Sequence, residues 1–457
     1  KIGIVCYPTY GGSGVVATEL GIAFAEKGHE VHFISYDQPF RLELFSDKIY
    51  YHEVNIPSYP LFEYTPYELN LTSKLVDVTI HEKLDILHVH YAIPHASAAV
   101  NAKQILLTHS INIPIVTTLH GTDITLLGKD KSFKPVIEYA INSSDAITTV
   151  SQNLKEVTNN NFKINKQIDH VPNFIDLKLY DKRFNKNLRS SYANSDEFIL
   201  THISNFRKVK RVNDVIEVFN LVSKMHKCKL LMIGDGPERL EAELLCRKYG
   251  LSNKIKFLGK LKLIENILSF ADVFLLPSET ESFGLVALEA MASKTVVIST
   301  NSGGLPEVNI DNKTGFLSDV GDIDKMSKDI SNLLSNKELL ETMKINAFNH
   351  AKSFDLPRIL PIYEEIYYRL LKWLNVMLKI GITGGIGVGK TYVSNIIEKM
   401  GYPVFYADQT AKDLVKSDYK LIESIKKEFG HDIFLNEKID SKKLSNIVFG
   451  DSNALNK

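Results

Sequence analysis

Residues 278–292 read SETESFGLVALEAMA and follow the apolar run DVFLLP at 272–277. Such a run is typical of a buried parallel strand, and open α/β sheets bind ligands where their strands end. The second half of the stretch is apolar on nearly every side, which predicts a buried helix. The stretch therefore predicts an α/β fold with a ligand site at this strand end.

Glu289 lies inside this apolar helix, where a charge without a partner costs more free energy than the helix recovers. One interpretation is a structural ion pair. Glu281, in the turn before the helix, suggests another, because the Glu-x7-Glu spacing resembles the donor-site signature of retaining GT-B glycosyltransferases. In that family the first glutamate meets the donor sugar and the second binds the ribose hydroxyls of the nucleotide. Both interpretations stay open on this evidence.

Length and composition set limits on the function. The chain has 457 residues, of which 44% are hydrophobic and 24% charged, and 54 basic residues balance 54 acidic ones. The length predicts about three domains. The balanced charge argues against nucleic acid or an anionic membrane as the main partner, and no apolar run approaches the ~20 residues of a membrane span. We expect a cytoplasmic enzyme; a homo-oligomer stays open.

The three cysteines, Cys6, Cys228 and Cys246, lie far apart in the sequence. They form neither a metal-ligand pair nor a disulfide framework. We expect all three to be buried small hydrophobic residues in a reducing compartment.

Strands and helices alternate in the first part of the chain. The apolar run 2–6, the glycine-rich turn YPTYGGSG at 7–14 and the helical pattern 15–27 begin a Rossmann-like unit. The amides of such a turn favour an anion, although the spacing is not G-x-G-x-x-G. Further strands are predicted at 31–35, 49–54, 86–90, 113–119 and 146–150.

Four histidines lie at or just beyond the ends of two of these strands: His88, His90, His95 and His120. They could suggest a metal, but no acidic or cysteine ligand accompanies them at a recognisable spacing. We therefore interpret His120 as a hydrogen-bonding group in a cleft and the other three as strand-end histidines with satisfied ring nitrogens.

A second α/β series follows a short proline-bearing link at 171–176. Its predicted strands are 198–204, 229–233, 256–258, 273–276 and 296–299, and its predicted helices include 212–225, 237–249, 264–270, 322–335 and 337–353. We expect an acceptor-side domain at 1–170 and a donor domain at 171–356, with a helix at 357–375 completing the first. Two such domains would face each other across a cleft.

Loops of the second domain concentrate cations and glycines. The run SNFRKVKR at 204–211 leaves a strand and enters a helix, and such a run is either a solvated surface or a phosphate site. The turns GDGP at 234–237 and SGGLPE at 302–307 also follow strands, and the second opens a helix whose dipole would face a pyrophosphate. We expect these turns to converge on one cleft.

Residues 1 to about 375 as a whole resemble a retaining GT-B glycosyltransferase. Within that group the runs at 7–20, 38–42, 88–96 and 120–126 closely resemble the N-acetyl-α-D-glucosaminyl L-malate synthases of bacillithiol biosynthesis. The resemblance implies transfer of N-acetylglucosamine from UDP-GlcNAc to the hydroxyl of L-malate, with retention of the α configuration. It also implies that this transfer needs no metal and no other cofactor.

The resemblance, together with charge arguments, suggests roles for individual residues. Arg207 and Lys210 would stabilise the negative charge on departing UDP in place of a divalent cation. No carboxylate in the acceptor-side runs is an obvious covalent nucleophile, so front-face attack fits better than double displacement. The candidate catalytic residues are His120, Arg207, Lys210 and Glu281; the donor-binding ones are Gly11, Gly12, Gly234, Gly303, Gly304 and Glu289; the acceptor-binding ones are Ser13, Arg41, Tyr91 and Thr118.

Two other functions stay open. One is a GT-B glycosyltransferase that acts on a lipid or glycan, and the other is a binding protein for a nucleotide sugar without catalysis. A lipid acceptor favours a basic amphipathic segment, which the first domain lacks. A binding protein would not need both Glu281 and the Arg207 and Lys210 pair.

A separate motif begins near residue 377. GGIGVGKT at 384–391, after a predicted strand at 377–383, matches the Walker A pattern G-x-x-x-x-G-K-[ST] and implies Mg-ATP as ligand. With GYPVFYAD at 401–408 the segment resembles the start of dephospho-CoA kinase, although Tyr406 replaces the more usual acidic residue. The implied ATP-site residues are Gly384, Gly389, Lys390, Thr391 and Asp408.

Residues 377–457 are few for the closed sheet and lid of such a kinase, and small domains bury little surface. We therefore expect an incomplete segment without kinase activity. Met377 would suit the start of a separate reading frame, so a natural fusion and a truncated neighbouring gene both stay open.

Overall fold

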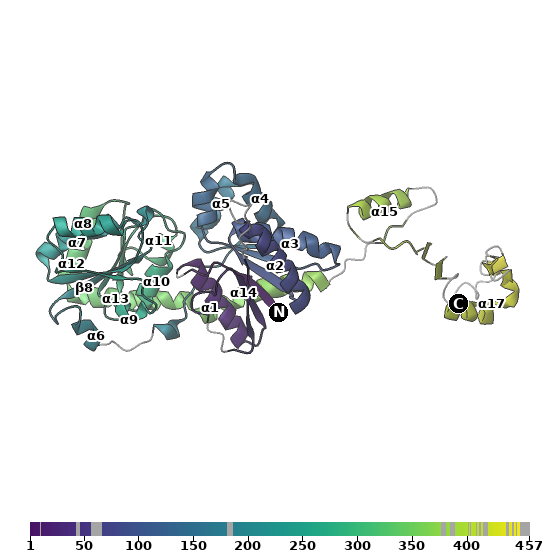
Figure 1. Ribbon diagram of the computed structural model, residues 1–457, viewed down its shortest axis with the longest axis horizontal. Helices are drawn as coiled ribbons and strands as arrows, with labels where there is room; N and C mark the ends of the chain where they lie inside the picture. Colours follow the sequence, from purple (N-terminus) through teal and green to yellow (C-terminus); the bar gives the residue numbers. More distant parts are fainter. Residues whose placement is uncertain are drawn as a thin grey trace. The chain divides into compact units, whose positions relative to one another are not determined.

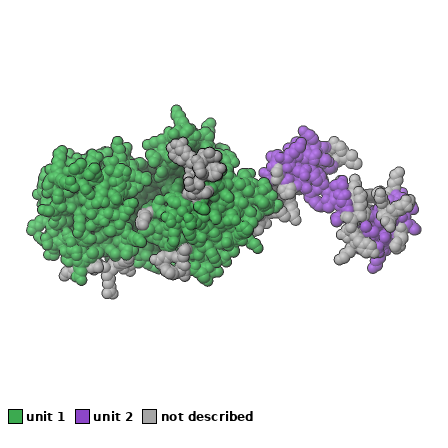
Figure 2. Space-filling view, in the orientation of Figure 1, with its two compact units in different colours: residues 1–376 green, residues 377–457 purple. Residues whose placement is uncertain are grey.

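A computed structural model describes residues 1–9, 11–42, 46–55, 66–180, 186–375, 381–383, 389–400 and parts of 402–447. The chain forms two compact units (Figure 2): unit 1 is Lys1–Val376 and unit 2 is Met377–Lys457. Unit 1 contains two lobes, each built around its own parallel sheet (Figure 1).

The acceptor-side lobe holds seven parallel strands in the order β3-β2-β1-β4-β5-β6-β7. They are β1 (Ile2–Val5), β2 (Val31–Ser35), β3 (Ile49–Glu53), β4 (Ile86–His90), β5 (Ile115–Leu119), β6 (Ala146–Thr149) and β7 (Ile168–His170). Its main helices are α1 (Ser13–Glu26), α2 (Tyr67–Glu82), α3 (Ser97–Thr108), α4 (Lys134–Ser143) and α5 (Gln152–Asn161). Side chains alternate between the two faces, so Val5 packs with α2 and α3 whereas Ile4 packs with α1.

The donor lobe holds six parallel strands in the order β10-β9-β8-β11-β12-β13. They are β8 (Phe198–Ser204), β9 (Cys228–Gly234), β10 (Ile255–Gly259), β11 (Val273–Leu276), β12 (Val296–Thr300) and β13 (Gly315–Ser318). Its helices are α6 (Lys186–Ser190), α7 (Val212–Met225), α8 (Arg239–Lys248), α9 (Glu265–Leu268), α10 (Leu285–Ala292), α11 (Leu305–Val308), α12 (Ile323–Ser335) and α13 (Lys337–Ala351). Along β11, Leu275 packs with α7 and α12 while Phe274 packs with α10, so both faces are covered.

The last helix of unit 1, α14 (Leu356–Asn375), returns to the acceptor-side lobe. Ile359 and Tyr363 belong to the same core as Ile4 of β1. The chain passes between the lobes twice, and these two segments lie side by side: the amide of Leu356 donates to the carbonyl of Ile175 at 2.8 Å. The helix predicted at 357–375 thus packs in the core of the first lobe.

The doubly wound α/β arrangement predicted for both lobes is confirmed. The sequence reading missed β7 and β13, which are only three and four residues long. Cys6, Cys228 and Cys246 are buried and unbridged, as expected. No helix among the described residues is long and apolar enough to span a bilayer.

Unit 2 contains α15 (Lys390–Lys399), α17 (Tyr419–Phe429) and a hairpin of β14 (Phe434–Leu435) with β15 (Lys438–Ile439). Of the strand predicted at 377–383, the described part, 381–383, has no strand structure, so that prediction is wrong there. A parallel strand needs a neighbour for its backbone hydrogen bonds, and the described residues of this unit form only the hairpin. Gly384 and Asp408 lie outside the described residues, and Gly389 caps α15 at φ +81°.

Candidate active site

Each sheet reverses its strand order once, and these switch points are where open α/β sheets bind ligands. In the donor lobe the reversal lies between β8 and β11, and in the acceptor-side lobe between β1 and β4. Figure 2 shows the surface of unit 1 indented between its lobes.

Lys210 and Glu281 meet at the donor switch point. Lys210 ends a short 3-10 turn after β8, and its Nζ donates to Glu281 Oε1 at 2.5 Å. Ser278 Oγ donates to the same carboxylate oxygen at 2.9 Å. The two charged side chains are only 19% and 13% exposed, so water screens the pair less than a surface ion pair. Two of the predicted catalytic residues are thus in direct contact.

Arg207 precedes the same turn and is exposed. Its guanidinium has no hydrogen bond or ion pair to any described residue. Burial raises the pKa of Tyr91 to about 12, and the charge of Arg207 acts against this rise. Arg207 therefore extends its positive field toward the acceptor-side lobe and remains available to an anion.

The predicted glycine turns pack on the loops that carry these groups. Gly303 has φ +63°, and a Cβ there would lie 2.0 Å from the carbonyl oxygen of Glu281. A Cβ on Gly304 would lie 2.4 Å from the carbonyl oxygen of Ser282, and a Cβ on Gly234 would lie 1.8 Å from that of Ser204. Only glycine permits these approaches.

The turn at 302–307 opens a helix, as predicted, but this helix is short. Helix α11 has four residues, so its dipole is small and the turn can offer a ligand only a few backbone amides. One of these, the amide of Gly304, already donates to the carbonyl of Glu281 at 2.8 Å.

Glu289 is buried in α10 and has two partners. Tyr180 Oη donates to Glu289 Oε1 at 2.8 Å, and a guanidinium nitrogen of Arg41 lies 4.0 Å from the same oxygen. Arg41 also forms an ion pair with Glu19. Burial raises the pKa of Glu289 to about 7. Arg41 was predicted to bind the acceptor, but these carboxylates already neutralise it.

Ser13 and Tyr91 meet at the acceptor-side switch point. Ser13 begins α1, Tyr91 follows β4, and their hydroxyl oxygens lie 2.6 Å apart. Tyr91 has φ +85°, a conformation that costs free energy for a residue with a side chain. A Cβ on Gly11 or Gly12, in the turn that precedes α1, would meet nothing within 4 Å.

Three of the four histidines, His88, His90 and His120, form a buried stack behind this pair. His90 Nδ1 lies 2.7 Å from His120 Nε2, and their ring centroids are 5.0 Å apart. Burial lowers the pKa of His120 to about 3, so its imidazole is neutral near pH 7. The predicted hydrogen-bonding group therefore carries no charge.

The ring nitrogens of His88 and His95 all have partners, as expected, whereas His90 Nε2 has none among the described residues. Thr118 bonds both His88 and Thr148 through Oγ1 and is fully buried, so its side chain is not exposed to an acceptor.

Contacts between the lobes fix the loop that carries Glu281. Ser151 Oγ donates to the carbonyl of Ser282 at 2.5 Å. The Glu307 carboxylate accepts the amides of Gln152 and Asn153, each at 2.8 Å, and so caps α5 of the opposite lobe. The sequence predicts Glu307 only as part of a glycine turn, because no local pattern reveals a cap supplied by another domain.

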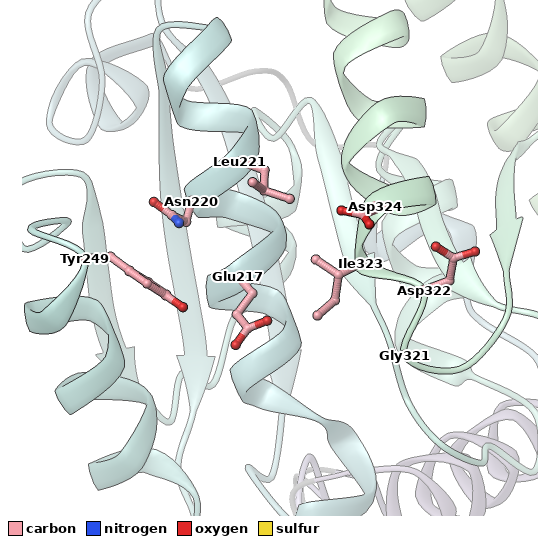
Figure 3. A pocket seen from close by; sticks show the side chains of 8 residues that line it. All are labelled: Glu217, Asn220, Leu221, Tyr249, Gly321, Asp322, Ile323 and Asp324. Atoms are coloured by element: carbon pink, nitrogen blue, oxygen red, sulfur yellow. The ribbon is translucent and has the colours of Figure 1, made fainter.

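A hollow on the donor lobe has a different character (Figure 3). It lies between α7, the end of α8 and the start of α12, and contains none of the predicted site residues. Its lining includes the carboxylates of Glu217, Asp322 and Asp324, which would repel a phosphate.

Comparison with known proteins agrees with this arrangement. A family model described as Glycosyltransferase Family 4 matches residues 10–179, and one described as Glycosyl transferases group 1 matches 184–350. Over 374 residues, 81% of this chain and 97% of the relative, the sequence is 47% identical to the N-acetyl-alpha-D-glucosaminyl L-malate synthase of Bacillus anthracis. The chain belongs to this family of glycosyltransferases.

More distant similarities cover the same region of the chain. An uncharacterized glycosyltransferase of Methanocaldococcus jannaschii is 28% identical over 347 residues, 74% of this chain and 91% of the relative. A sucrose-phosphate synthase structure from Thermosynechococcus elongatus has a TM-score of 0.69 at 20% identity, covering 81% of this chain and 99% of that one. An Anabaena protein in complex with UDP and glucose has a TM-score of 0.67 at 19% identity, covering 80% and 99%. The structural likenesses show the GT-B fold.

Unit 2 matches a different protein family. A model described as Dephospho-CoA kinase matches residues 378–457. This match confirms the resemblance to dephospho-CoA kinase that the Walker A run suggested, and it extends over residues 378–457.

Proposed function

We propose that unit 1 transfers N-acetylglucosamine from UDP-GlcNAc to the hydroxyl of L-malate with retention of the α configuration, as the first step of bacillithiol biosynthesis. The printed activity of the relative from Bacillus anthracis supports this substrate pair. The observation that carries the proposal is the pairing of the two switch points: Lys210 with Glu281 on one sheet, and Ser13 with Tyr91 on the other.

On the donor side, cations act on the leaving group. Negative charge develops on the UDP oxygen as the glycosidic bond breaks, and Arg207 and Lys210 stabilise it. In the structure, Lys210 holds Glu281 in place. With donor bound, the diphosphate takes up part of the ammonium charge and the Glu281 carboxylate accepts hydroxyls of the sugar. Neither role needs a metal ion.

Glu289 binds the ribose in this proposal. Its carboxylate already accepts one hydroxyl, from Tyr180, and carries a second oxygen for a sugar hydroxyl. Arg41 then serves to balance the carboxylate charge rather than to bind malate, because it lies between Glu19 and Glu289.

On the acceptor side, neutral groups receive malate. The Ser13 and Tyr91 hydroxyls bond the acceptor, and Arg207 supplies positive charge from the opposite lobe. Asp123 is a carboxylate of these loops, but its oxygens accept the amides of Ala92 at 2.7 Å and Gly121 at 3.1 Å. It is therefore a poor covalent nucleophile, which supports front-face attack with the departing phosphate accepting the proton.

The cysteines suggest the compartment in which the reaction takes place. We place it in the cytoplasm, since three buried free cysteines suit a reducing compartment. The Walker A residues of unit 2 take no part in it.

An assay of UDP release tests the proposal. The full chain is incubated with UDP-GlcNAc and, in turn, L-malate, other hydroxy acids, and lipid or glycan acceptors. We expect malate to give the largest stimulation, and a chelator to leave the rate unchanged. Silence with malate alongside activity on a lipid or glycan would show instead a GT-B enzyme of different acceptor class.

A further inference from the structure

We propose that His32, His52 and Glu82 form a Zn²⁺ site in the acceptor-side lobe, separate from the glycosyl-transfer site. Among the residues that the structure describes, this is the one group of three histidine, cysteine or acidic side chains close enough to share a metal ion. The proposal concerns stability and not the transfer reaction.

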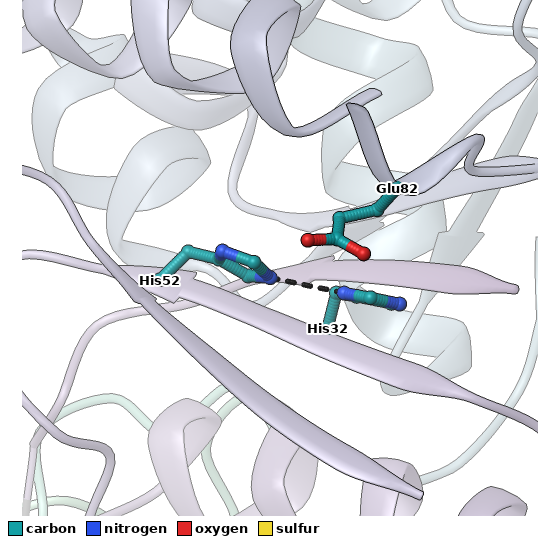
Figure 4. Close-up of side chains that lie close together, drawn as sticks. All are labelled: His32, His52 and Glu82. Atoms are coloured by element: carbon teal, nitrogen blue, oxygen red, sulfur yellow. Dashed lines mark hydrogen bonds between the residues drawn. The ribbon is translucent and has the colours of Figure 1, made fainter. Parts of the chain in front are cut away.

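Three different elements bring these side chains together. His32 is the second residue of β2, His52 lies in the edge strand β3, and Glu82 is the last residue of α2. In the parallel register Ile34 pairs with His52, so His32 and His52 project from the same face of the sheet, two positions apart. Figure 4 shows the Glu82 carboxylate directed toward the two imidazoles.

The distances suit one small cation. His32 Nδ1 and His52 Nε2 lie 2.9 Å apart, and one donor atom from each of the three residues lies within 4.8 Å of the others. In tetrahedral zinc sites the metal–nitrogen bonds are about 2.0–2.1 Å, which places neighbouring ligand atoms about 3.3 Å apart. The imidazoles need to separate by only about 0.4 Å, and the carboxylate to close in by a side-chain rotation.

The chemistry of the donors also favours zinc. Two imidazoles and a carboxylate are ligands that zinc accepts, with water in the fourth position. Burial lowers the pKa of both imidazoles, so they are neutral near pH 7, as metal ligands must be. The side chains of Lys1, Glu30, Lys74 and Asp77 also act electrostatically on this pair.

The surroundings hold the rings in place. Tyr50 stacks on His32 with ring centroids 4.6 Å apart, and the two histidine rings stack at 5.2 Å. His32 is fully buried, and its Nδ1, which lies 2.9 Å from His52 Nε2, is the ring nitrogen that would bind the metal; its Nε2 has no hydrogen-bond partner in the described part of the chain. A metal bound at Nδ1 would tie the edge strand to β2 and α2.

The site is tested by titrating the full-length chain, first freed of metal by a chelator, with Zn²⁺. Bound zinc is measured by equilibrium dialysis and the melting temperature is measured in parallel. We expect about one zinc per chain and a higher melting temperature. His52→Gln and Glu82→Gln should each weaken zinc binding by at least about tenfold.

His81→Gln is the matched control, because this neighbouring histidine on α2 is 75% exposed and contacts Asp77 instead. It should bind zinc as the unaltered chain does. Co²⁺ provides a test that needs no variant: the unaltered chain should give the visible absorption of a tetrahedral nitrogen and oxygen site. Absence of that absorption, or equal zinc binding in the unaltered chain and both ligand variants, overturns the proposal.

Discussion

The two switch points of unit 1 differ in charge. The donor point holds Lys210 against Glu281, with Arg207 exposed beside them. The acceptor point holds two hydroxyls, on Ser13 and Tyr91, with a neutral imidazole behind them. Two lobes of the same architecture thus differ at their switch points: charged groups gather on the donor lobe, and neutral hydrogen-bonding groups gather on the acceptor-side lobe.

Removing a donor-side cation should have the largest effect. Arg207→Ala or Lys210→Ala is expected to lower kcat by roughly two to three orders of magnitude, because each removes one partner of the charge that develops on UDP. Steady-state UDP release measures this. Lys208→Ala, an exposed lysine in the same turn, is the control and should stay within about twofold. Equal losses of kcat in all three variants would show that Arg207 and Lys210 have no specific role in catalysis.

A smaller effect is expected behind the acceptor point. His90→Leu removes the partner of His120 and should lower kcat by about 10- to 100-fold through misplacement of that ring. Because both imidazoles are neutral near pH 7, the pH profile of kcat should keep its shape above pH 6. His109→Asn, at an exposed position after α3, should match the unaltered chain. A changed pH profile in His90→Leu would show a proton-transfer role instead.

The buried carboxyl group of Glu289 should make the stability of the protein depend on pH. Burial raises its pKa from 4.5 to about 7, so the folded state binds more protons than the unfolded state between these values. Its favourable contribution to stability is complete below about pH 4.5 and is lost as the pH rises through about 7, a change of roughly 3 kcal/mol. The unfolding free energy of the unaltered chain minus that of Glu289→Gln, measured by denaturant titration, should fall as the pH rises over this range.

The same substitution should raise KM for UDP-GlcNAc and leave kcat nearly unchanged, because the ribose is distant from the bond that breaks. A loss confined to kcat would contradict the ribose assignment.

The smallest effect is expected from removing unit 2. Truncation after Leu374 should leave glycosyl transfer within about twofold, since both switch points lie in unit 1, which has its own cores. UDP release by the truncated and full chains measures this. A large loss with an unchanged melting temperature of unit 1 would assign the tail a role in the reaction.

The sequence predicted what is local. The strand ends and the glycine turns were predicted where the structure has them, because strand pairing and the right-handed crossover bring the ends of parallel strands to one edge. It could not predict that Arg41 pairs with Glu19 and Glu289, or that Glu307 caps α5, because these contacts join distant parts of the chain.

Short elements were also missed for a physical reason. Strand β7, Ile168–His170, carries too few apolar residues to show a pattern, and it exists because β6 offers it hydrogen bonds. Conversely, the run at 377–383 was predicted as a strand, yet its described part, 381–383, forms none, and the described residues of unit 2 offer it no parallel neighbour.

The most direct test of the account is to identify the product made by the purified full chain from UDP-GlcNAc and L-malate. Mass spectrometry gives its composition, and nuclear magnetic resonance gives the configuration at the anomeric carbon. The account predicts N-acetylglucosamine joined to the malate hydroxyl in the α configuration, with UDP released in equal amount. A β-linked product, or release of free N-acetylglucosamine without a malate conjugate, would contradict it.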